Sequence, residues 1–102
     1  MADKILQINF RYSVSPDEYT AAVTDMADDF AAVDGLKWKV WIMNEKRREA
    51  GGIYLFNNQA SLDAFLEGPL AAAVTSHPAL VDFSVRQFDV MPDITAITRG
   101  PV

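Results

Sequence analysis

The segment from Leu36 to Phe56 constrains the fold of this chain more than any other. It reads LKWKVWIMNEKRREAGGIYLF, two apolar and aromatic runs separated by a charged turn, which predicts a β-hairpin. Trp38 and Trp41 lie an odd number of positions apart in the first run, so they should point to opposite faces of the strand. The second run opens on Gly51-Gly52, and glycines in a strand mark a bulge or a close approach to the backbone. The hairpin is therefore either the centre of a small core or the wall of an apolar pocket.

Strand and helix patterns alternate along the rest of the chain. Apolar and polar side chains alternate over residues 4–12 and again over residues 80–90, which predicts a strand in each. Ser15 and Glu18 form a capping box around Pro16, and an apolar stripe at helical spacing then runs to Phe30. We expect one helix there, ended by Asp34-Gly35.

A second helical region is predicted after Asn57-Asn58, which can cap its start. Gly68-Pro69 interrupts it because proline cannot continue the hydrogen-bond ladder, and residues 69–76 form a second helical piece. The resulting order, β-α-β-β-α-β, is that of the ferredoxin-like fold. We therefore expect a single α+β domain over residues 1–102, with a four-stranded antiparallel sheet and its helices on one face.

The sequence also predicts a second subunit that covers the other face of the sheet. One tryptophan of the hairpin should lie on each face, and a sheet with helices on one side leaves one of them poorly covered. Large exposed apolar patches usually mark interfaces, so we expect a homodimer with two sheets packed face to face. Residues 91–102 carry Ile94 and Ile97, and we expect this tail to pack on the partner subunit.

Composition excludes several classes of function. The net charge of −5 argues against nonspecific binding of nucleic acid, and no apolar run reaches the ~18 residues of a membrane span. Cysteine is absent, which removes disulfides and thiolate chemistry and suits a cytoplasmic protein. With His77 as the single histidine, metal catalysis is not expected. The basic side chains of the hairpin are interpreted as an exposed turn and an edge strand, and these are Lys37, Lys39, Lys46, Arg47 and Arg48.

The hairpin resembles a known family. W-K-V-W at residues 38–41, Glu45-Lys46, and E-A-G-G-I-Y-L-F at residues 49–56 resemble the YdhR-type monooxygenases of the dimeric α/β-barrel superfamily. L-Q-I-N-F at residues 6–10 and F-D-V at residues 88–90 also fit. The resemblance implies a ferredoxin-like dimer that uses O₂ without a cofactor to oxidise an aromatic, anthrone- or quinol-like molecule. No glycine-rich phosphate loop is present, so flavin or nicotinamide is not expected.

Such an oxygenase needs a cavity whose polar groups assist deprotonation of the substrate and hold the anion. The candidate catalytic residues are Asn9, Tyr54 and Arg86, and the candidate substrate-binding walls are Trp38, Trp41 and Phe56. Each has a structural alternative: the aromatic residues as core or interface, Asn9 and Tyr54 bonded internally, and Arg86 paired with a nearby acid. The alternative functions are a non-catalytic dimer that binds small molecules, and an acid–base isomerase on the same scaffold.

Overall fold

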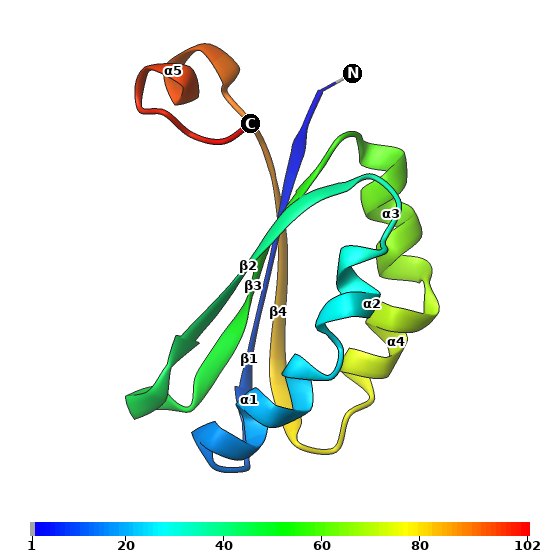
Figure 1. Cartoon of the computed structure of the whole chain (residues 1–102), viewed down its shortest axis with the longest axis vertical. Coiled ribbons are helices and arrows are strands. Elements are labelled where there is room, and N and C mark those ends of the chain that lie inside the picture. Colours follow the sequence, from blue (N-terminus) through cyan, green and yellow to red (C-terminus); the bar gives the residue numbers. More distant parts are fainter. Residues whose placement is uncertain (1) are drawn as a thin grey trace.

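The computed structural model describes residues 2–102 and contains the predicted ferredoxin-like α+β fold (Figure 1). A four-stranded antiparallel sheet has the strand order β2-β3-β1-β4. Its strands are β1 (Lys4–Tyr12), β2 (Leu36–Asn44), β3 (Glu49–Phe56) and β4 (Leu80–Asp89). Four helices cover one face, and these are α1 (Pro16–Thr24), α2 (Ala27–Ala31), α3 (Gln59–Glu67) and α4 (Pro69–Thr75).

The first helical region is two helices, so the prediction of a single helix is wrong in this detail. The capping box at Ser15 and Glu18 starts α1 as predicted. The helix ends at a tightened turn, in which the Met26 amide donates to the Val23 carbonyl at 3.0 Å, three residues back instead of four. The short α2 then carries Phe30 onto the sheet, so the apolar stripe is kept although the helix is broken.

The second strand of the hairpin begins earlier than its predicted start at Gly51-Gly52. The strand β3 begins at Glu49, before the double glycine, because the turn closes within a single 3-10 turn over Glu45–Arg47. The Asn44 side chain caps this turn by accepting a hydrogen bond from the Arg47 amide at 3.3 Å. Arg48 then takes a left-handed backbone conformation with φ of 51° and redirects the chain into β3.

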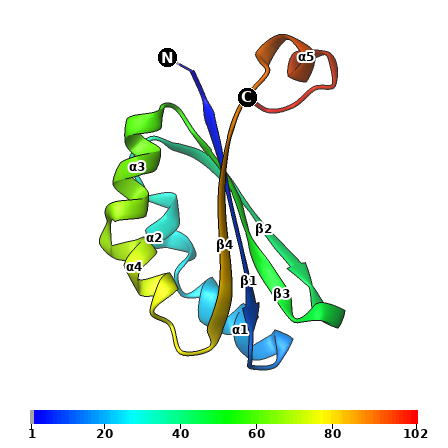
Figure 2. The ribbon, with the colours of Figure 1, turned by 180° about the vertical axis from the view of Figure 1, so that it is seen from behind.

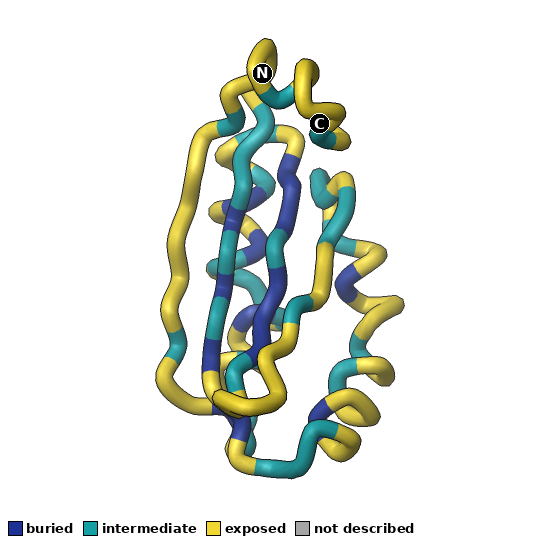
Figure 3. The backbone as a smooth tube through the Cα atoms, turned by 90° about the vertical axis from the view of Figure 1, so that its left-hand side faces the viewer, coloured by how far each residue is buried: buried dark blue, intermediate teal, exposed yellow. Residues whose placement is uncertain are grey.

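The strand register divides the side chains between two faces of the sheet. We call the face covered by α1 to α4 the helix face, and the other the open face. Tyr54 is paired with Leu6 of β1 and with Lys39 of β2, and these three side chains share the helix face. Trp38 is paired with Leu55 on the open face, which α1 to α4 leave uncovered (Figure 3). Because Trp41 lies three residues further along β2, the two tryptophans point to opposite faces, as predicted.

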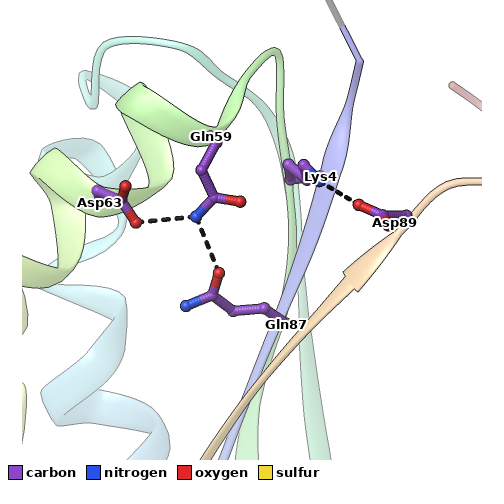
Figure 4. Close-up of polar contacts among 5 residues, drawn as sticks. All are labelled: Lys4, Gln59, Asp63, Gln87 and Asp89. Carbon is purple, nitrogen blue, oxygen red and sulfur yellow. Dashed lines mark hydrogen bonds and ion pairs between the residues drawn. The ribbon is translucent and has the colours of Figure 1, made fainter.

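The core lies between the helix face and the helices. Leu6, Phe56 and Leu62 are fully buried there. Polar contacts join the helical layer to the sheet at one end: Gln59 of α3 donates to Gln87 of β4 at 2.9 Å (Figure 4). The ion pair between Lys4 and Asp89 joins β1 to β4 beside this contact.

The last strand contains an irregularity that the alternation did not predict. Asp82 has a left-handed backbone with φ of 57°, and the pairing of β1 with β4 shifts register between Asn9 and Arg11. Val81 is therefore paired with Arg11 on the open face, whereas Phe83 packs against the core. The predicted alternation over residues 80–90 would put Val81 and Phe83 on one face, and it is wrong at this point because the extra residue of a bulge reverses it.

The C-terminal tail lies beyond one end of the sheet, on the side away from the helices (Figure 2). It contains the short helix α5 (Pro92–Ile97), and the Trp38 indole N–H donates to the Pro101 carbonyl at 2.8 Å. The tail is thus anchored to its own subunit, while Ile97 remains 77% exposed. Within residues 2–102, every helix is too short or too polar to cross a membrane.

Candidate functional site

A cavity of about 170 Å³ lies between the helix face and the helices α1 and α2. The end of α4 and the segment that leads into β4 close its remaining side. Its walls are mainly apolar, and the titratable side chains that line it are Glu18, Tyr19, Lys39, Tyr54 and His77. An apolar cavity with a few convergent polar groups is the usual form of a small-molecule site.

Lys39 contributes an amine to the wall of this cavity. Its Nζ lies 3.3 Å from the centroid of the Trp41 ring, 3.5 Å from that of Phe30 and 4.6 Å from that of Tyr54. We call these three rings the aromatic cage. Phe30 and Trp41 meet edge to face, with centroids 5.2 Å apart and planes at 83°, so the cage has fixed walls from α2 and β2.

The two glycines of the hairpin make this arrangement possible. A Cβ on Gly52 would lie 2.6 Å from Lys39 Cε and 3.2 Å from a ring carbon of Tyr54. A Cβ on Gly51 would lie only 1.9 Å from the Ile8 carbonyl oxygen of the neighbouring strand. Gly52 therefore leaves room for the Lys39 side chain, whereas Gly51 permits the close approach of β1 and β3.

The enclosure changes the chemistry of the Lys39 amine. Burial lowers the pKa of Lys39 from 10.5 to about 7, because the charged form loses water without gaining a carboxylate. Among residues 2–102, the ion pairs of lysine join Lys4 to Asp89 and Lys37 to Asp3, and none includes Lys39. The ring faces of the cage act in the opposite direction, because they attract the ammonium form. Both protonation states of the amine are accessible near neutral pH.

Two tyrosines give the cavity hydroxyl groups that remain protonated. Burial, and secondarily the charge of Tyr12, raises the pKa of Tyr19 to about 12. Burial also raises the pKa of Tyr54, with a smaller contribution from the charge of Tyr19. Both hydroxyls are therefore neutral at pH 7 and available as hydrogen-bond donors. His77 lies at the closed end, where its Nδ1 accepts a hydrogen bond from the Ala79 amide at 3.1 Å.

These groups can perform acid–base chemistry on a small ring. A neutral amine can accept the proton of a phenol, and hydroxyl donors can stabilise the anion that forms. A cavity of about 170 Å³ is slightly larger than the ~150 Å³ that accommodates benzene, which matches a single substituted ring. Within residues 2–102, no cluster of three His, Asp or Glu is placed to hold a metal ion.

The structure brings two of the six predicted site residues into the cavity. Tyr54 and Trp41 line it. Phe56 is 0% exposed and stacks below Tyr54 with ring centroids 6.2 Å apart, so it supports the wall without lining the cavity. Trp38 lies on the open face with the tail.

Asn9 and Arg86 also lie on the open face, so the three predicted catalytic residues do not converge. Asn9 is three residues from Leu6, the register partner of Tyr54, and an odd separation reverses the face. Its side chain donates to Glu49 at 3.1 Å. Arg86 lies over the Phe88 ring, 5.4 Å from its centroid, and makes no ion pair with an acid among residues 2–102.

Lys39 is not among the predicted site residues, because in the sequence it lies with the basic residues interpreted as an exposed turn and an edge strand. The structure corrects that interpretation for this residue, which is half-buried on the helix face. A usable signal was present. Lys39 lies two residues from Trp41 in the strand, so the two side chains point to the same face of the sheet. A lysine on the same face as a tryptophan that packs on the helices departs from the usual pattern, in which polar side chains point to solvent.

The chain belongs to the family described as "Putative mono-oxygenase ydhR", whose model matches residues 5–101. The match includes both strands of the hairpin and the tail, and it confirms the resemblance found in the sequence. Among curated proteins, none matches this chain.

Solved structures share the fold at low sequence identity. SnoaB, a cofactor-independent oxygenase from Streptomyces nogalater, has a TM-score of 0.71 at 16% identity, over 91% of this chain and 100% of its own. Protein SO0527 from Shewanella oneidensis has a TM-score of 0.72 at 15% identity, over 87% of this chain and 91% of its own. A dimeric ferredoxin-like protein of unknown function from Thermobifida fusca has a TM-score of 0.66 at 21% identity, over 88% of this chain and 93% of its own. At these identities the likeness establishes the fold.

Proposed function

We propose that this protein is a cofactor-independent monooxygenase that oxidises a small quinol-like aromatic molecule with O₂. The observation that carries the proposal is the Lys39 amine, enclosed by the aromatic cage in a cavity of about 170 Å³. Membership of the mono-oxygenase family and the fold shared with the oxygenase SnoaB support the same reaction class. The cavity size favours a single-ring quinol over a three-ring anthrone.

The proposed reaction balances without an added reductant. A hydroquinone supplies two hydrogens and the electrons that accompany them. One oxygen atom of O₂ enters the ring to give a hydroxyquinone, and the other leaves as water. The protein has to deprotonate the substrate, hold its anion beside O₂ and return a proton to the departing oxygen.

Residues of the cavity can supply each of these steps. The neutral form of Lys39 accepts the phenolic proton, and the resulting ammonium remains beside the phenolate. The hydroxyls of Tyr19 and Tyr54 donate hydrogen bonds to the anion, because their raised pKa values keep them protonated. The electron-rich anion then reduces O₂ to a bound peroxide, and the Lys39 ammonium returns its proton as the O–O bond breaks. Phe30 is 3% exposed and shields the ring from water, whereas Trp41 is 38% exposed and forms the outer wall of the cavity.

The protein is proposed to act as a homodimer through the open face. Val40 and Phe88 are 50% and 42% exposed on this face, and an apolar sheet surface of this kind is typical of an interface. Asn9 and Arg86 would then belong to the dimer contact. The tail adjoins the same surface and exposes Ile97, and we propose that it extends this contact onto the partner subunit.

Oxygen consumption tests the proposed reaction directly. A panel of hydroquinone, naphthohydroquinone and anthrone is incubated with the protein in the presence of a metal chelator, and uptake is corrected for spontaneous oxidation. We expect protein-dependent uptake with the quinols that is lost in Lys39→Met and kept in Lys46→Met, whose side chain is exposed in the turn. Binding without oxygen uptake across the panel would contradict the oxygenase and favour a binding protein. Proton exchange of the ligand without uptake would favour an isomerase.

A further inference from the structure

We propose that the Lys39 amine forms a reversible imine with small aromatic aldehydes or ketones that enter the cavity. This is an activity separate from oxygen chemistry, and it requires neither O₂ nor turnover of a quinol. It rests on the placement of a primary amine in the wall of an enclosed apolar cavity, with no carboxylate bound to it among residues 2–102.

The position of Lys39 differs from that of the other lysines. Lys4 is paired with Asp89, Lys37 is paired with Asp3 at 3.0 Å, and Lys46 lies exposed in the hairpin turn. An amine that is paired or fully hydrated is held as ammonium, which has no lone pair to attack a carbonyl. A lysine desolvated in an apolar pocket is the recognised form of an imine-forming nucleophile.

The aromatic cage suits the product as well as the free amine. A protonated imine is a cation, and its nitrogen would occupy the place of Nζ, 3.3 Å from the Trp41 centroid and 3.5 Å from the Phe30 centroid. The ring faces that attract the ammonium also attract this cation. The apolar walls add a second effect, because water is a product of imine formation and its exclusion opposes hydrolysis.

The bond changes need no reactant beyond the carbonyl compound. The Nζ lone pair attacks the carbonyl carbon, and a proton moves from nitrogen to oxygen to give a carbinolamine. The C–O bond then breaks, the hydroxyl takes a proton and leaves as water, and the nitrogen lone pair forms the C=N bond. Tyr19 and Tyr54 line the cavity and their hydroxyls remain protonated, so they are the candidate donors to the oxygen in both steps. Glu18 and His77 are the other titratable groups in the cavity wall.

The room in the cavity defines the carbonyl compounds that it accepts. About 170 Å³ is enough for a benzaldehyde-sized ring beside the amine, and it is too small for a four-ring aldehyde. A flat ring would lie against Trp41 and Phe30. The size of the aldehyde therefore distinguishes reaction at Lys39 from reaction at exposed amines, which can react with large aldehydes as well as small ones.

Reductive trapping provides the test. The protein is incubated with 4-hydroxybenzaldehyde and cyanoborohydride between pH 6 and 9, and the adducts are mapped by peptide mass spectrometry. We expect Lys39 to be modified about tenfold faster or more than Lys46, with a rate that reaches half its maximum near pH 7. The α-amino group reacts as well, and its adduct is separated in the N-terminal peptide.

Two controls make the result specific to the cavity. In Lys39→Arg the adduct on that peptide should vanish while the adduct on Lys46 is unchanged. With pyrene carboxaldehyde the preference for Lys39 should be lost, because four rings do not fit the cavity. Equal rates at Lys39 and Lys46 with the small aldehyde, in protein shown to be folded by circular dichroism, would overturn the proposal. Adduct formation without quinol oxidation would keep the imine and contradict the oxygenase, so the two outcomes are distinguishable.

Discussion

The two faces of the sheet each present a cation beside aromatic rings, but they differ in enclosure. On the helix face, Lys39 Nζ lies within 3.5 Å of two ring centroids, and its pKa falls to about 7. On the open face, the Arg86 guanidinium carbon lies 5.4 Å from the Phe88 centroid, and both side chains are exposed. Arginine keeps its charge in either setting, whereas a lysine responds to the loss of water.

The difference shows that the surroundings of a basic residue determine whether it can take part in acid–base chemistry. The helix face has a second layer, which removes water from Lys39 and leaves a cavity beside it. The open face of one subunit has no such layer, so its polar groups bond to each other, as Asn9 does with Glu49. We therefore assign acid–base chemistry to the helix face and association to the open face.

The largest expected effect is the difference in kcat/KM between a variant of Lys39 and a variant of Arg86. Lys39→Met removes the proton acceptor and should lower kcat/KM for quinol oxidation by about 10²- to 10⁴-fold. Arg86→Met should change it less than about threefold, because the side chain points away from the cavity and rim charges are worth little. Oxygen-electrode kinetics on both variants provide the comparison. Equal losses would remove the functional distinction between the faces.

The two glycines provide a second contrast. Gly51→Ala places a methyl group against the Ile8 carbonyl and should destabilise the protein by about 3 kcal/mol, measured by urea unfolding. Gly52→Ala meets the flexible end of Lys39, so it should cost about 1 kcal/mol in stability yet reduce activity about tenfold. If Gly52→Ala retained full activity, the position of Lys39 would not matter to turnover.

Substitutions of the two tryptophans should affect dimer association in one case and ligand binding in the other. Trp38→Leu removes an open-face ring and the hydrogen bond to the tail, and should weaken the dimer by about 2 kcal/mol, or roughly 30-fold. Trp41→Leu should leave the dimer intact and weaken binding of a non-oxidisable quinol analogue by about 1 kcal/mol. Sedimentation equilibrium and fluorescence titration measure the two effects. A wild-type protein that sediments as a monomer at micromolar concentration would contradict the role of the open face.

The smallest effect concerns stability as a function of pH. The folded pKa of Lys39 lies below its unfolded value of 10.5, so between about pH 7 and 10.5 the unfolded state binds more protons. The contribution of Lys39 to stability therefore rises with pH across this range. Lys39→Met should lack this rise, and the two free energies of unfolding should diverge by about 1–2 kcal/mol between pH 7 and 9.5. Parallel curves for wild type and variant would mean that the amine is not desolvated.

The sequence predicts the fold well because period and capping are local properties. Alternation, the capping box at Ser15 and the break at Gly68-Pro69 place the strands and helices without knowledge of the tertiary structure. The break after Thr24 was not predictable in this way, since the apolar stripe continues in phase across it. The bulge at Asp82 was missed for the same reason: alternation does not report an inserted residue.

The candidate site was less predictable because it depends on which face each side chain takes and on what covers that face. Asn9 and Arg86 looked suitable by chemistry, but the register places their side chains on the open face, whereas Tyr54 lies on the helix face. Lys39 looked like a surface residue by composition, yet Gly52 and the aromatic cage enclose it. The face of Lys39 could be inferred from its spacing to Trp41. Its enclosure depends on Phe30 of α2, which only the tertiary structure brings to it.

Direct titration of the Lys39 amine tests whether it is desolvated in the cavity, on which the assignment of the site depends. Lysine labelled with ¹³C at Cε reports its own protonation by NMR, and the signal of Lys39 is assigned by its absence from Lys39→Arg. We expect a titration midpoint near pH 7 for the Lys39 signal. A Lys39 signal that titrates above about pH 10, as a hydrated lysine does, would contradict the assignment of the site.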